Sequence, residues 1–318
     1  MKLIIQIPCY NEEETLPETY QDLPKSIAGI DQIEYLIIDD GSTDKTVEVA
    51  RNLGIHHIVS FKQNMGLAKG FMAGLDSCLC LGADIIVNTD ADNQYFGEDI
   101  EKLIQPILNN KADIVIGERP IDETEDFSWQ KKKFQRLGSW VVRIASGTKI
   151  PDAPSGFRAY SREAALRMNV TNEYTYTLET IIQSGHRKIP MESVPIRTNK
   201  TLRPSRLFSS MWKYMKQSAS VIVRSFIMYK PLKFFGTVGT IFLLLGAAIG
   251  LRFLFYFLIG EGSGRIQSLI LTAILLLMGV QMIFFGLIGD VIAANRKLLE
   301  DIQYRIRRKD SMNEKVDK

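Results

Sequence analysis

The chain has 318 residues, of which 24% are charged and 46% are hydrophobic, so its composition is that of a globular protein and excludes a disordered one. The net charge of +3 at pH 7 gives no reason to expect a nucleic-acid partner. Cys9, Cys78 and Cys80 form no metal-ligand or disulfide pattern, and they are typical of reduced thiols in a cytosolic domain.

Before residue 200, short β-rich runs alternate with helical patterns. Strands are predicted at 3–8, 34–39, 56–61, 84–89, 113–118 and 188–196, and helices at 12–27, 44–53, 66–81, 97–110 and 129–146. This alternation predicts an α/β domain with a mostly parallel sheet that is covered on both faces. Ligands of such sheets bind at the carboxyl ends of the strands.

Polar or glycine-rich sequences follow five of the predicted strands. They read "CYNEEE", "DDGSTD", "KQNMGLAKG", "DADNQY" and "ERP". One such loop would be ordinary turn composition. Five of them at the same edge of a sheet predict a single polar cleft.

The sequence "DADNQ" places Asp90 and Asp92 one residue apart at the end of a strand. Carboxylates held this close repel each other unless water or a cation lies beside them. Hard oxygen ligands suit Mg²⁺ or Mn²⁺, with substrate oxygens completing the shell. We therefore predict that Asp90 and Asp92 bind a divalent cation, with Gln94 as a third ligand; the alternative is a solvated turn.

The sequence "IIDDGSTDKT" doubles an aspartate at the end of another strand. Asp39 and Asp40 are placed to accept hydrogen bonds from the base or ribose of a nucleoside. Gly41 permits a close backbone approach, and Ser42 is a candidate helix N-cap. Capping by itself would explain Ser42 but not the doubled aspartate.

Two long apolar segments follow residue 230. The segment 234–260 contains one charged residue, Arg252, and the segment 266–289 contains none. Each exceeds the roughly 20 apolar residues that a helix needs to cross a bilayer core. The short turn between them predicts a transmembrane hairpin; a pair of buried helices in a large soluble core is the alternative.

Basic residues flank this hairpin. No Asp or Glu occurs between Ser193 and Gly260, whereas Lys and Arg crowd the start of that stretch and return at 296–309. The positive-inside rule therefore places both termini and the preceding domain in the cytoplasm. Apolar residues at helical spacing from 207 to 230 predict an amphipathic helix on the membrane surface, or a helix docked on the soluble domain.

Together these motifs resemble the family 2 glycosyltransferases. The matching sequences, in the family's order, are "IPCYNEEETL", "IIDDGSTDKT", "NMGLAKG", "TDADNQY", "GERP", "SGFRAYSR" and "SVPI", over roughly residues 3–196. With two spans behind this domain, the chain resembles the polyprenyl-phosphate glycosyltransferases, both GtrB-like and dolichyl-phosphate mannose synthase-like. The Gln-x-x-Arg-Trp motif of processive members is absent from the sequence.

The resemblance implies a GT-A fold, a Rossmann-like domain with a mostly parallel sheet, and the following domains. The glycosyltransferase domain spans 1–206, the amphipathic interfacial region 207–230 and the transmembrane hairpin 231–295, before a basic cytosolic tail at 296–318.

The resemblance also implies roles on the donor side. The residues that it assigns to the nucleotide-sugar are Pro8, Tyr10, Glu12, Asp39, Asp40, Asp90 and Arg119. Asp90, Asp92 and Gln94 would bind Mg²⁺ or Mn²⁺ and the donor diphosphate. Asp152 stands where such enzymes carry a candidate catalytic carboxylate, and Asp92 joins it among the catalytic residues.

On the acceptor side, the helix "QKKKFQRLGSW" leaves open which basic residue binds phosphate. The residues that the resemblance assigns to the acceptor phosphate are Arg119, Lys131, Arg136, Ser155, Arg158, Lys200, Arg203 and Arg206. Glu179 could brace the cleft or only form a salt bridge, and both interpretations stay open.

We expect an integral membrane enzyme that transfers a sugar, with inversion, from a nucleotide-sugar to a polyprenyl phosphate at the cytoplasmic face. A UDP-sugar is the first choice of donor and GDP-mannose the second, and either undecaprenyl or dolichyl phosphate fits as acceptor. A homo-oligomer is expected. The alternatives are transfer to a glycan or protein, and an inactive membrane scaffold that partners a flippase.

Overall fold

The computed structural model divides into two compact units, Met1–Ile222 with Ile302–Lys318, and Val223–Asp301. It describes residues 1–120, 129–170, 175–199, 226–260 and 265–316, together with 216, 220, 223 and 224; side chains at 129–137 and 311–316 lie outside the description. We call the first unit the catalytic unit and the second the apolar unit.

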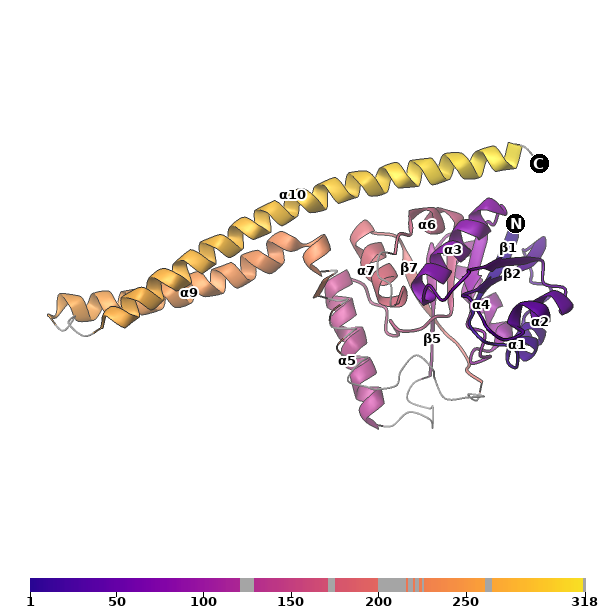
Figure 1. The fold of residues 1–318 in the computed structure, drawn as a ribbon, viewed down its shortest axis with the longest axis horizontal. Helices are drawn as coiled ribbons and strands as arrows, with labels where there is room; N and C mark the ends of the chain where they lie inside the picture. The colour runs from indigo at the N-terminus through magenta and orange to yellow at the C-terminus, as the bar shows by residue number, and fades with distance from the viewer. Residues whose placement is uncertain are drawn as a thin grey trace. The chain divides into compact units, whose positions relative to one another are not determined.

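A seven-stranded sheet forms the centre of the catalytic unit, in the order β3-β2-β1-β4-β6-β5-β7 (Figure 1). The strands are β1 (Lys2–Cys9), β2 (Gln32–Asp39), β3 (His57–Ser60), β4 (Ile85–Asn88), β5 (Ile114–Glu118), β6 (Arg158–Ser161) and β7 (Met191–Pro195). All pairs are parallel except those of β6, which runs antiparallel to β4 and β5. The predicted α/β class with a mostly parallel sheet is confirmed.

The sequence analysis does not predict β6. Its four residues, "RAYS", are too few for a recognisable alternation, and they begin with a charged residue, Arg158. The strand exists because β4 and β5 lie on either side of it and pair with its backbone. This insertion brings the segment that precedes β6 to the carboxyl ends of β4 and β5.

Helices cover both faces of the sheet. On one face Leu3, Ile5 and Ile7 of β1 join a core with residues of the helices on that face. These helices are α1 (Leu16–Asp22), α2 (Thr46–Asn52) and α4 (Ile100–Leu108), the last preceded by the 3₁₀ turn Gly97–Asp99. Each fully buried Leu or Ile side chain contributes about 1.5–3 kcal/mol to this core.

Helix α3 (Leu67–Cys80) lies close against the other face. A Cβ atom at Gly74 would come within 2.4 Å of Oε1 of Gln6 and 2.8 Å of Cδ1 of Ile38, so only glycine permits this approach. The remaining helices of the unit are α5 (Trp129–Ser146), α6 (Arg162–Arg167) and α7 (Thr177–Arg187). The bounds of α5 coincide with the predicted helix at 129–146.

The apolar unit contains α9 (Pro231–Leu258) and the greater part of α10 (Ile266–Val316). Both helices are long and apolar enough to cross a membrane; α9 covers the first predicted span up to Leu258, and α10 includes the whole of the second. Gly239 and Gly279 face each other, since a Cβ atom at Gly239 would lie 2.7 Å from the carbonyl oxygen of Gly279. Small residues let the two backbones approach, as at helix interfaces in membranes.

The end of α10, from Ile302 onward, belongs to the catalytic unit. Tyr304 donates a hydrogen bond to Oε1 of Glu163 at 2.8 Å, and Arg307 forms an ion pair with Asp76 at 3.1 Å. Arg307 also donates to the carbonyl oxygen of Met168 at 2.6 Å. The segment predicted as a basic tail is thus helical to Val316, and its first part is docked on α3 and α6.

Candidate active site

Hydrogen bonds tie the loop after β1 to the loop after β2. Oδ1 of Asn11 accepts from the backbone N–H of Thr43 at 2.8 Å, and the N–H of Asn11 donates to Oγ of Ser42 at 3.0 Å. The N–H of Glu12 donates to Oγ1 of Thr46 at 2.8 Å. These bonds fix the positions of Tyr10 and Glu12, two of the residues predicted to bind the nucleoside.

The doubled aspartate has structural partners as well. Oδ1 of Asp39 accepts from the N–H of Ser42 at 2.9 Å. Both carboxylate oxygens of Asp40 accept backbone N–H groups, from Met65 at 2.6 Å and from Gly66 at 3.0 Å. Burial raises the pKa of Asp40, and the two backbone hydrogen bonds oppose that rise. Asp40 therefore holds the start of α3 against the end of β2.

Asp90, Asp92 and Gln94 come together at the carboxyl end of β4, each partly exposed. The amide of Gln94 donates to Oδ2 of Asp90 at 2.7 Å. The Tyr95 hydroxyl also donates to the Asp90 carboxylate and accepts from the N–H of Gly156 at 3.1 Å. Burial, followed by the charge of Asp92, raises the pKa of Asp90 to about 7.

These residues fit a divalent cation on the chemistry of their donors. Two carboxylates at a partly exposed edge offer hard oxygen atoms, and a cation would offset both the burial of Asp90 and the charge of Asp92 that together raise the pKa of Asp90. In the described part of the chain, no group of three or more His, Cys, Asp or Glu side chains could hold a metal ion. Water and substrate oxygens would have to complete the shell.

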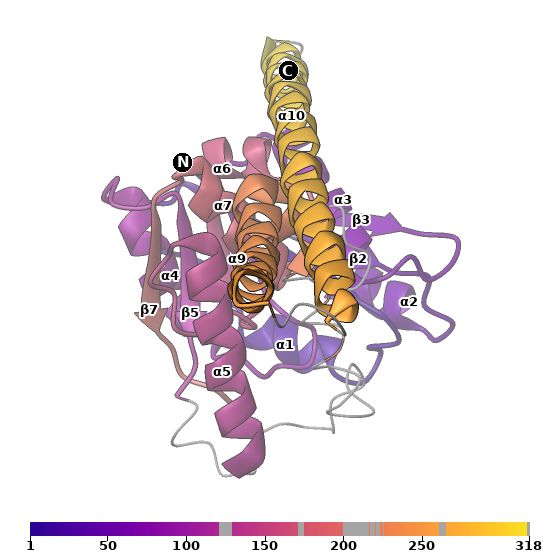
Figure 2. The ribbon, with the colours of Figure 1, turned by 90° about the vertical axis from the view of Figure 1, so that its left-hand side faces the viewer.

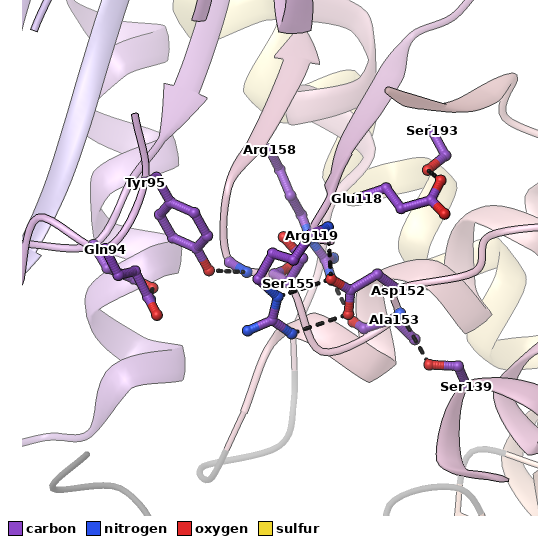
Figure 3. A network of polar contacts seen from close by, with 12 residues as sticks. Gln94, Tyr95, Glu118, Arg119, Ser139, Asp152, Ala153, Ser155, Arg158 and Ser193 are labelled. Atoms are coloured by element: carbon purple, nitrogen blue, oxygen red, sulfur yellow. Dashed lines mark hydrogen bonds and ion pairs between the residues drawn. The ribbon is translucent and has the colours of Figure 1, made fainter. Parts of the chain in front are cut away.

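Arg119 and Asp152 form a bidentate ion pair between the end of β5 and the segment before β6 (Figure 3). Nε and Nη2 of Arg119 lie 2.8 and 2.9 Å from the two oxygens of Asp152, and the backbone N–H of Arg119 adds a contact of 3.2 Å. Burial by itself would lower the pKa of Arg119, but the charge of Asp152 raises it overall. Arg119 therefore stays charged, and it also attracts Asp90.

The segment that leads into β6 is held by Arg158, whose side chain is fully buried. Its guanidinium donates to the carbonyl oxygens of Ser155 at 2.8 Å and Ala153 at 2.7 Å, and to Oγ1 of Thr180 at 2.7 Å. Ser155 is also fully buried, and its Oγ has no hydrogen-bond partner among the described residues. Ser155 in the segment before β6 and Arg158 at the start of β6 are thus both buried. Their contact with the acceptor phosphate stays a prediction.

A chain of buried amide and hydroxyl groups beneath the site was not identified from the sequence. Nε2 of Gln6 donates to Oδ1 of Asn88 at 2.8 Å, and Nδ2 of Asn88 donates to the carbonyl oxygen of Gly156 at 2.9 Å and to the Tyr176 hydroxyl at 2.8 Å. The signal was present, because Gln6 and Asn88 interrupt the apolar runs "LIIQIP" and "DIIVNT". A polar residue inside a buried strand needs a hydrogen-bond partner.

Gly156 connects this hydrogen-bonded network to Asp90. A Cβ atom there would lie 3.0 Å from Oδ2 of Asp90 and 3.1 Å from the Tyr176 hydroxyl. Glycine at this position lets the backbone come close to Asp90.

The structure thus brings one group of the predicted site residues together, and a second group lies outside the residues that it describes. Arg119 pairs with Asp152 (Figure 3), and Asp90 lies close enough to Arg119 and Asp92 for their charges to interact, with Gln94 bonded to Asp90. The side chains of Lys131 and Arg136, together with Lys200, Arg203 and Arg206 and most of 207–225, lie outside the described residues. Glu179 is buried on α7.

Comparison with known proteins gives a match between residues 4–167 and the model of the family described as "Glycosyl transferase family 2". A UDP-N-acetylglucosamine–dolichyl-phosphate N-acetylglucosaminyltransferase of Methanococcus voltae is 31% identical over 60% of this chain and 83% of its own. An undecaprenyl-phosphate 4-deoxy-4-formamido-L-arabinose transferase of Sodalis glossinidius is 25% identical over 96% of this chain and 92% of its own.

Among solved structures, glucosyl-3-phosphoglycerate synthase of Mycobacterium tuberculosis, in complex with Mn²⁺, UDP and phosphoglyceric acid, has a similar fold. The TM-score is 0.57 at 18% identity, and the similarity covers 71% of this chain and 78% of the other. At this identity the comparison speaks for the fold alone.

Proposed function

The chain belongs to glycosyl transferase family 2 and is a glycosyltransferase with a GT-A fold, and on that premise we propose that it transfers a sugar from a nucleotide-sugar to a polyprenyl phosphate. We place the reaction at the cytoplasmic face of a membrane and give it an inverting course. A UDP-sugar is the first choice of donor and GDP-mannose the second. The acceptors in the names of the two curated relatives, dolichyl and undecaprenyl phosphate, support the acceptor class.

The nucleoside would lie over the ends of β1 and β2. Tyr10 is exposed there, and the hydrogen bonds between the two loops hold it in place. Asp40 already accepts two backbone N–H groups, whereas the described contacts of Asp39 engage only its Oδ1. We therefore propose that Asp39 supplies the carboxylate oxygen that the nucleoside contacts directly, with Asp40 acting through the loop that it fixes.

The donor diphosphate would lie beside Asp90 and Asp92. These residues, with Gln94 or substrate oxygens, would hold Mg²⁺ or Mn²⁺, which would supply positive charge to the departing diphosphate. Gln94 and Tyr95 hold the Asp90 carboxylate from two sides. Arg119 adds a fixed positive charge near Asp90, and its side chain is 14% exposed.

The acceptor is a phosphate that is already anionic at neutral pH, so the site has little need of a strong general base. Alignment and charge neutralisation matter more. Asp152 suits that role because both of its oxygens are engaged by Arg119 and its side chain is fully buried. We propose that Asp152 orients Arg119 rather than removing a proton. Attack from the side opposite the diphosphate would invert the anomeric centre.

The two helices of the apolar unit would anchor the enzyme and keep it near its lipid acceptor. Both are long and apolar enough to cross a membrane. The flanking basic residues support cytoplasmic termini by the positive-inside rule. We expect a homo-oligomer, which cross-linking in membranes would detect.

The meeting of Asp90 and Asp92 with the Arg119–Asp152 pair, in a chain with two candidate spans, is the observation that carries this proposal. The test is to incubate membranes that contain the protein with a panel of labelled nucleotide-sugars, and to extract with organic solvent. We expect one label to move into the lipid extract. Label in a glycan or in protein would support the alternative acceptors, and transfer from none of the donors would support the inactive scaffold.

A further inference from the structure

The segment after β7 pairs with the loop after β4. β7 is the edge strand of the sheet, next to β5 (Figure 2), and we call residues 89–96, between β4 and the 3₁₀ turn, the β4 loop. Thr198 and Tyr95 form an isolated antiparallel bridge, and the backbone N–H of Asn199 donates to the carbonyl oxygen of Gln94 at 3.0 Å. A segment far along the chain therefore contacts the loop that carries the predicted metal ligands.

Asn199 engages the carbonyl groups of three consecutive residues in the β4 loop. Nδ2 of its side chain donates to the carbonyl oxygen of Asn93 at 3.0 Å and lies 3.5 Å from that of Tyr95. Its backbone N–H bonds to the carbonyl oxygen between them, at Gln94. The two N–H bonds of one side-chain amide can serve two acceptors. Through its side chain and its backbone, Asn199 therefore fixes the path of the loop from Asn93 to Tyr95.

Asn93 has a backbone conformation that needs such support. Its φ is 53°, in the left-handed region, which asparagine tolerates better than most residues. Its side chain is buried, and Nδ2 donates to Oδ2 of Asp22, at the end of α1, at 2.8 Å. A residue in this region costs free energy and persists where its surroundings hold it. The β4 loop is therefore held by α1 through Asp22 and by the segment after β7 through Asn199.

The loop held in this way positions the Asp90 carboxylate. Gln94 donates to Oδ2 of Asp90 at 2.7 Å, and the Tyr95 hydroxyl donates to the same carboxylate. Both side chains belong to residues whose carbonyl groups contact Asn199. Groups that orient a metal ligand commonly change the metal affinity when they are removed. Asn199 is therefore connected to Asp90 through two neighbouring residues of the loop.

Arg197 attaches the segment after β7 independently of Asn199. Its guanidinium lies 2.8 Å from Oδ1 of Asp99, and its Cζ lies 3.8 Å from the centre of the Phe96 ring. Its backbone N–H also donates to Oδ2 of Asp99 at 2.6 Å. These contacts remain when Asn199 loses its side chain, and so does the backbone N–H of residue 199. We therefore expect a substitution at Asn199 to leave the segment in place and to release part of the loop.

We propose that Asn199 is a positioning residue of the active site, which holds the β4 loop so that Gln94 and Tyr95 keep Asp90 in place for a divalent cation. The proposal rests on the cation site of the proposed function. The predicted site residues include Gln94 but not Asn199, because a lone asparagine outside the strand-end motifs gives no signal in the sequence. A purely structural residue would change stability but not the affinity for the cation, and this difference separates the two roles.

The test measures the affinity of the purified full chain for Mn²⁺ from the EPR signal of free Mn²⁺, with the metal alone and with UDP or GDP added. For Asn199→Ala we expect the dissociation constant for Mn²⁺ to rise about tenfold, the lower end of the effect of losing an orienting group. Sugar transfer by this variant should recover when the Mn²⁺ concentration is raised by the same factor.

Tyr35→Phe is the matched control. It also removes a donor to a backbone carbonyl oxygen, since the Tyr35 hydroxyl donates to that of Pro24 at 2.8 Å. We expect this variant to lose stability and to leave the affinity for Mn²⁺ unchanged. An equal loss of Mn²⁺ affinity in Tyr35→Phe and Asn199→Ala would overturn the proposal, because general destabilisation would then explain both.

A second measurement tests the connection through Gln94. In a Gln94→Ala background, Asn199→Ala should weaken Mn²⁺ binding by a smaller factor than in the native chain, because part of the connection is already lost. Equal factors in the two backgrounds would contradict the proposal, since substitutions at independent sites have additive effects on the free energy.

Two further outcomes separate this role from the cation site itself. Unchanged Mn²⁺ affinity in Asn199→Ala, in a native chain that binds Mn²⁺, would refute the role of Asn199 and leave the cation site intact. A native chain that binds no Mn²⁺ under any of these conditions would refute both. If Asn199→Ala does not fold, Asn199→Ser takes its place. Its hydroxyl can donate to one carbonyl oxygen, so we expect a smaller rise of the dissociation constant, and no rise would again refute the role.

Discussion

Two pairs of aspartates end the strands on either side of β1, and their surroundings differ. Asp39 and Asp40 at the end of β2 accept three backbone N–H groups, from Ser42, Met65 and Gly66. Asp90 and Asp92 lie after β4, and burial, followed by the charge of Asp92, raises the pKa of Asp90 to about 7. The described contacts of the first pair are with the backbone, whereas the second pair places two carboxylates close together after β4.

The difference shows why the residue type alone does not reveal the role of an acidic pair. Two backbone N–H groups engage the oxygens of Asp40 and oppose the rise in pKa that burial causes, so this carboxylate has little to offer a cation. When a second carboxylate lies nearby, binding of a cation stabilises the charged form of both groups more strongly. The comparison predicts that changes after β4 alter activity and that a change at Asp40, after β2, alters stability first.

The largest effect is expected from Asp92→Asn. We predict that sugar transfer falls at least about a hundredfold, the scale of losing one electrostatic contact to the transition state. The unfolding temperature should stay the same or rise slightly, because the repulsion of Asp90 is removed. Transfer of labelled sugar and thermal unfolding of the purified protein measure the two. Undiminished turnover would refute the role of Asp92 in metal binding.

Asp152→Asn is expected to lower both activity and stability. It leaves the largely buried Arg119 without its counter-charge, and breaking a buried ion pair costs about 3–5 kcal/mol. We predict a loss of transfer of about tenfold or more, since Arg119 is no longer held toward the cleft. Denaturant unfolding and transfer rates at saturating donor give the two values. A near-normal rate in a destabilised protein would make Asp152 purely structural.

Asp40→Asn is expected mainly to lower the stability of the fold. An amide can accept only one of the two N–H groups that Asp40 now accepts, so we expect the free energy of unfolding to fall by about 2 kcal/mol. Asp39→Asn serves as the matched control, because its carbonyl oxygen can still accept from Ser42; we expect it to raise KM for the nucleotide-sugar with little loss of stability. Chemical denaturation and donor titration measure both. An unchanged midpoint in Asp40→Asn would contradict the comparison.

The last prediction concerns the pH dependence of stability in the metal-free protein. Because the folded state raises the pKa of Asp90 from 3.8 to about 7, its contribution to stability is fully present below pH 3.8 and is lost as the pH rises toward 7. The slope is at most about 1.4 kcal/mol per pH unit. Unfolding at pH 5 and pH 8 in chelator should show this loss, and Asp90→Asn should remove it. A wild-type slope of zero would contradict the raised pKa.

Much of the architecture could be predicted from periodicity. Strands β1, β2 and β5 follow apolar runs, α5 matches its predicted bounds, and the two apolar segments identify α9 and the first part of α10. The elements that the sequence analysis missed lie where the hydrophobic pattern of the sequence is weak. Strand β6 is short and begins with a charged residue, and the continuation of α10 to Val316 passes through a polar sequence that resembles a tail.

The sequence by itself determined the class of the fold and the two apolar helices, because hydrophobic spacing and motif order are local properties, and it singled out the acidic and basic residues that stay predicted site residues. Only the tertiary structure decided which charged side chains pair with each other. Asp152 pairs with Arg119 across 33 positions of sequence, and Gly156 approaches Asp90 because β6 enters the sheet antiparallel to β4. Such encounters depend on strand order and register, which no single segment of the chain encodes.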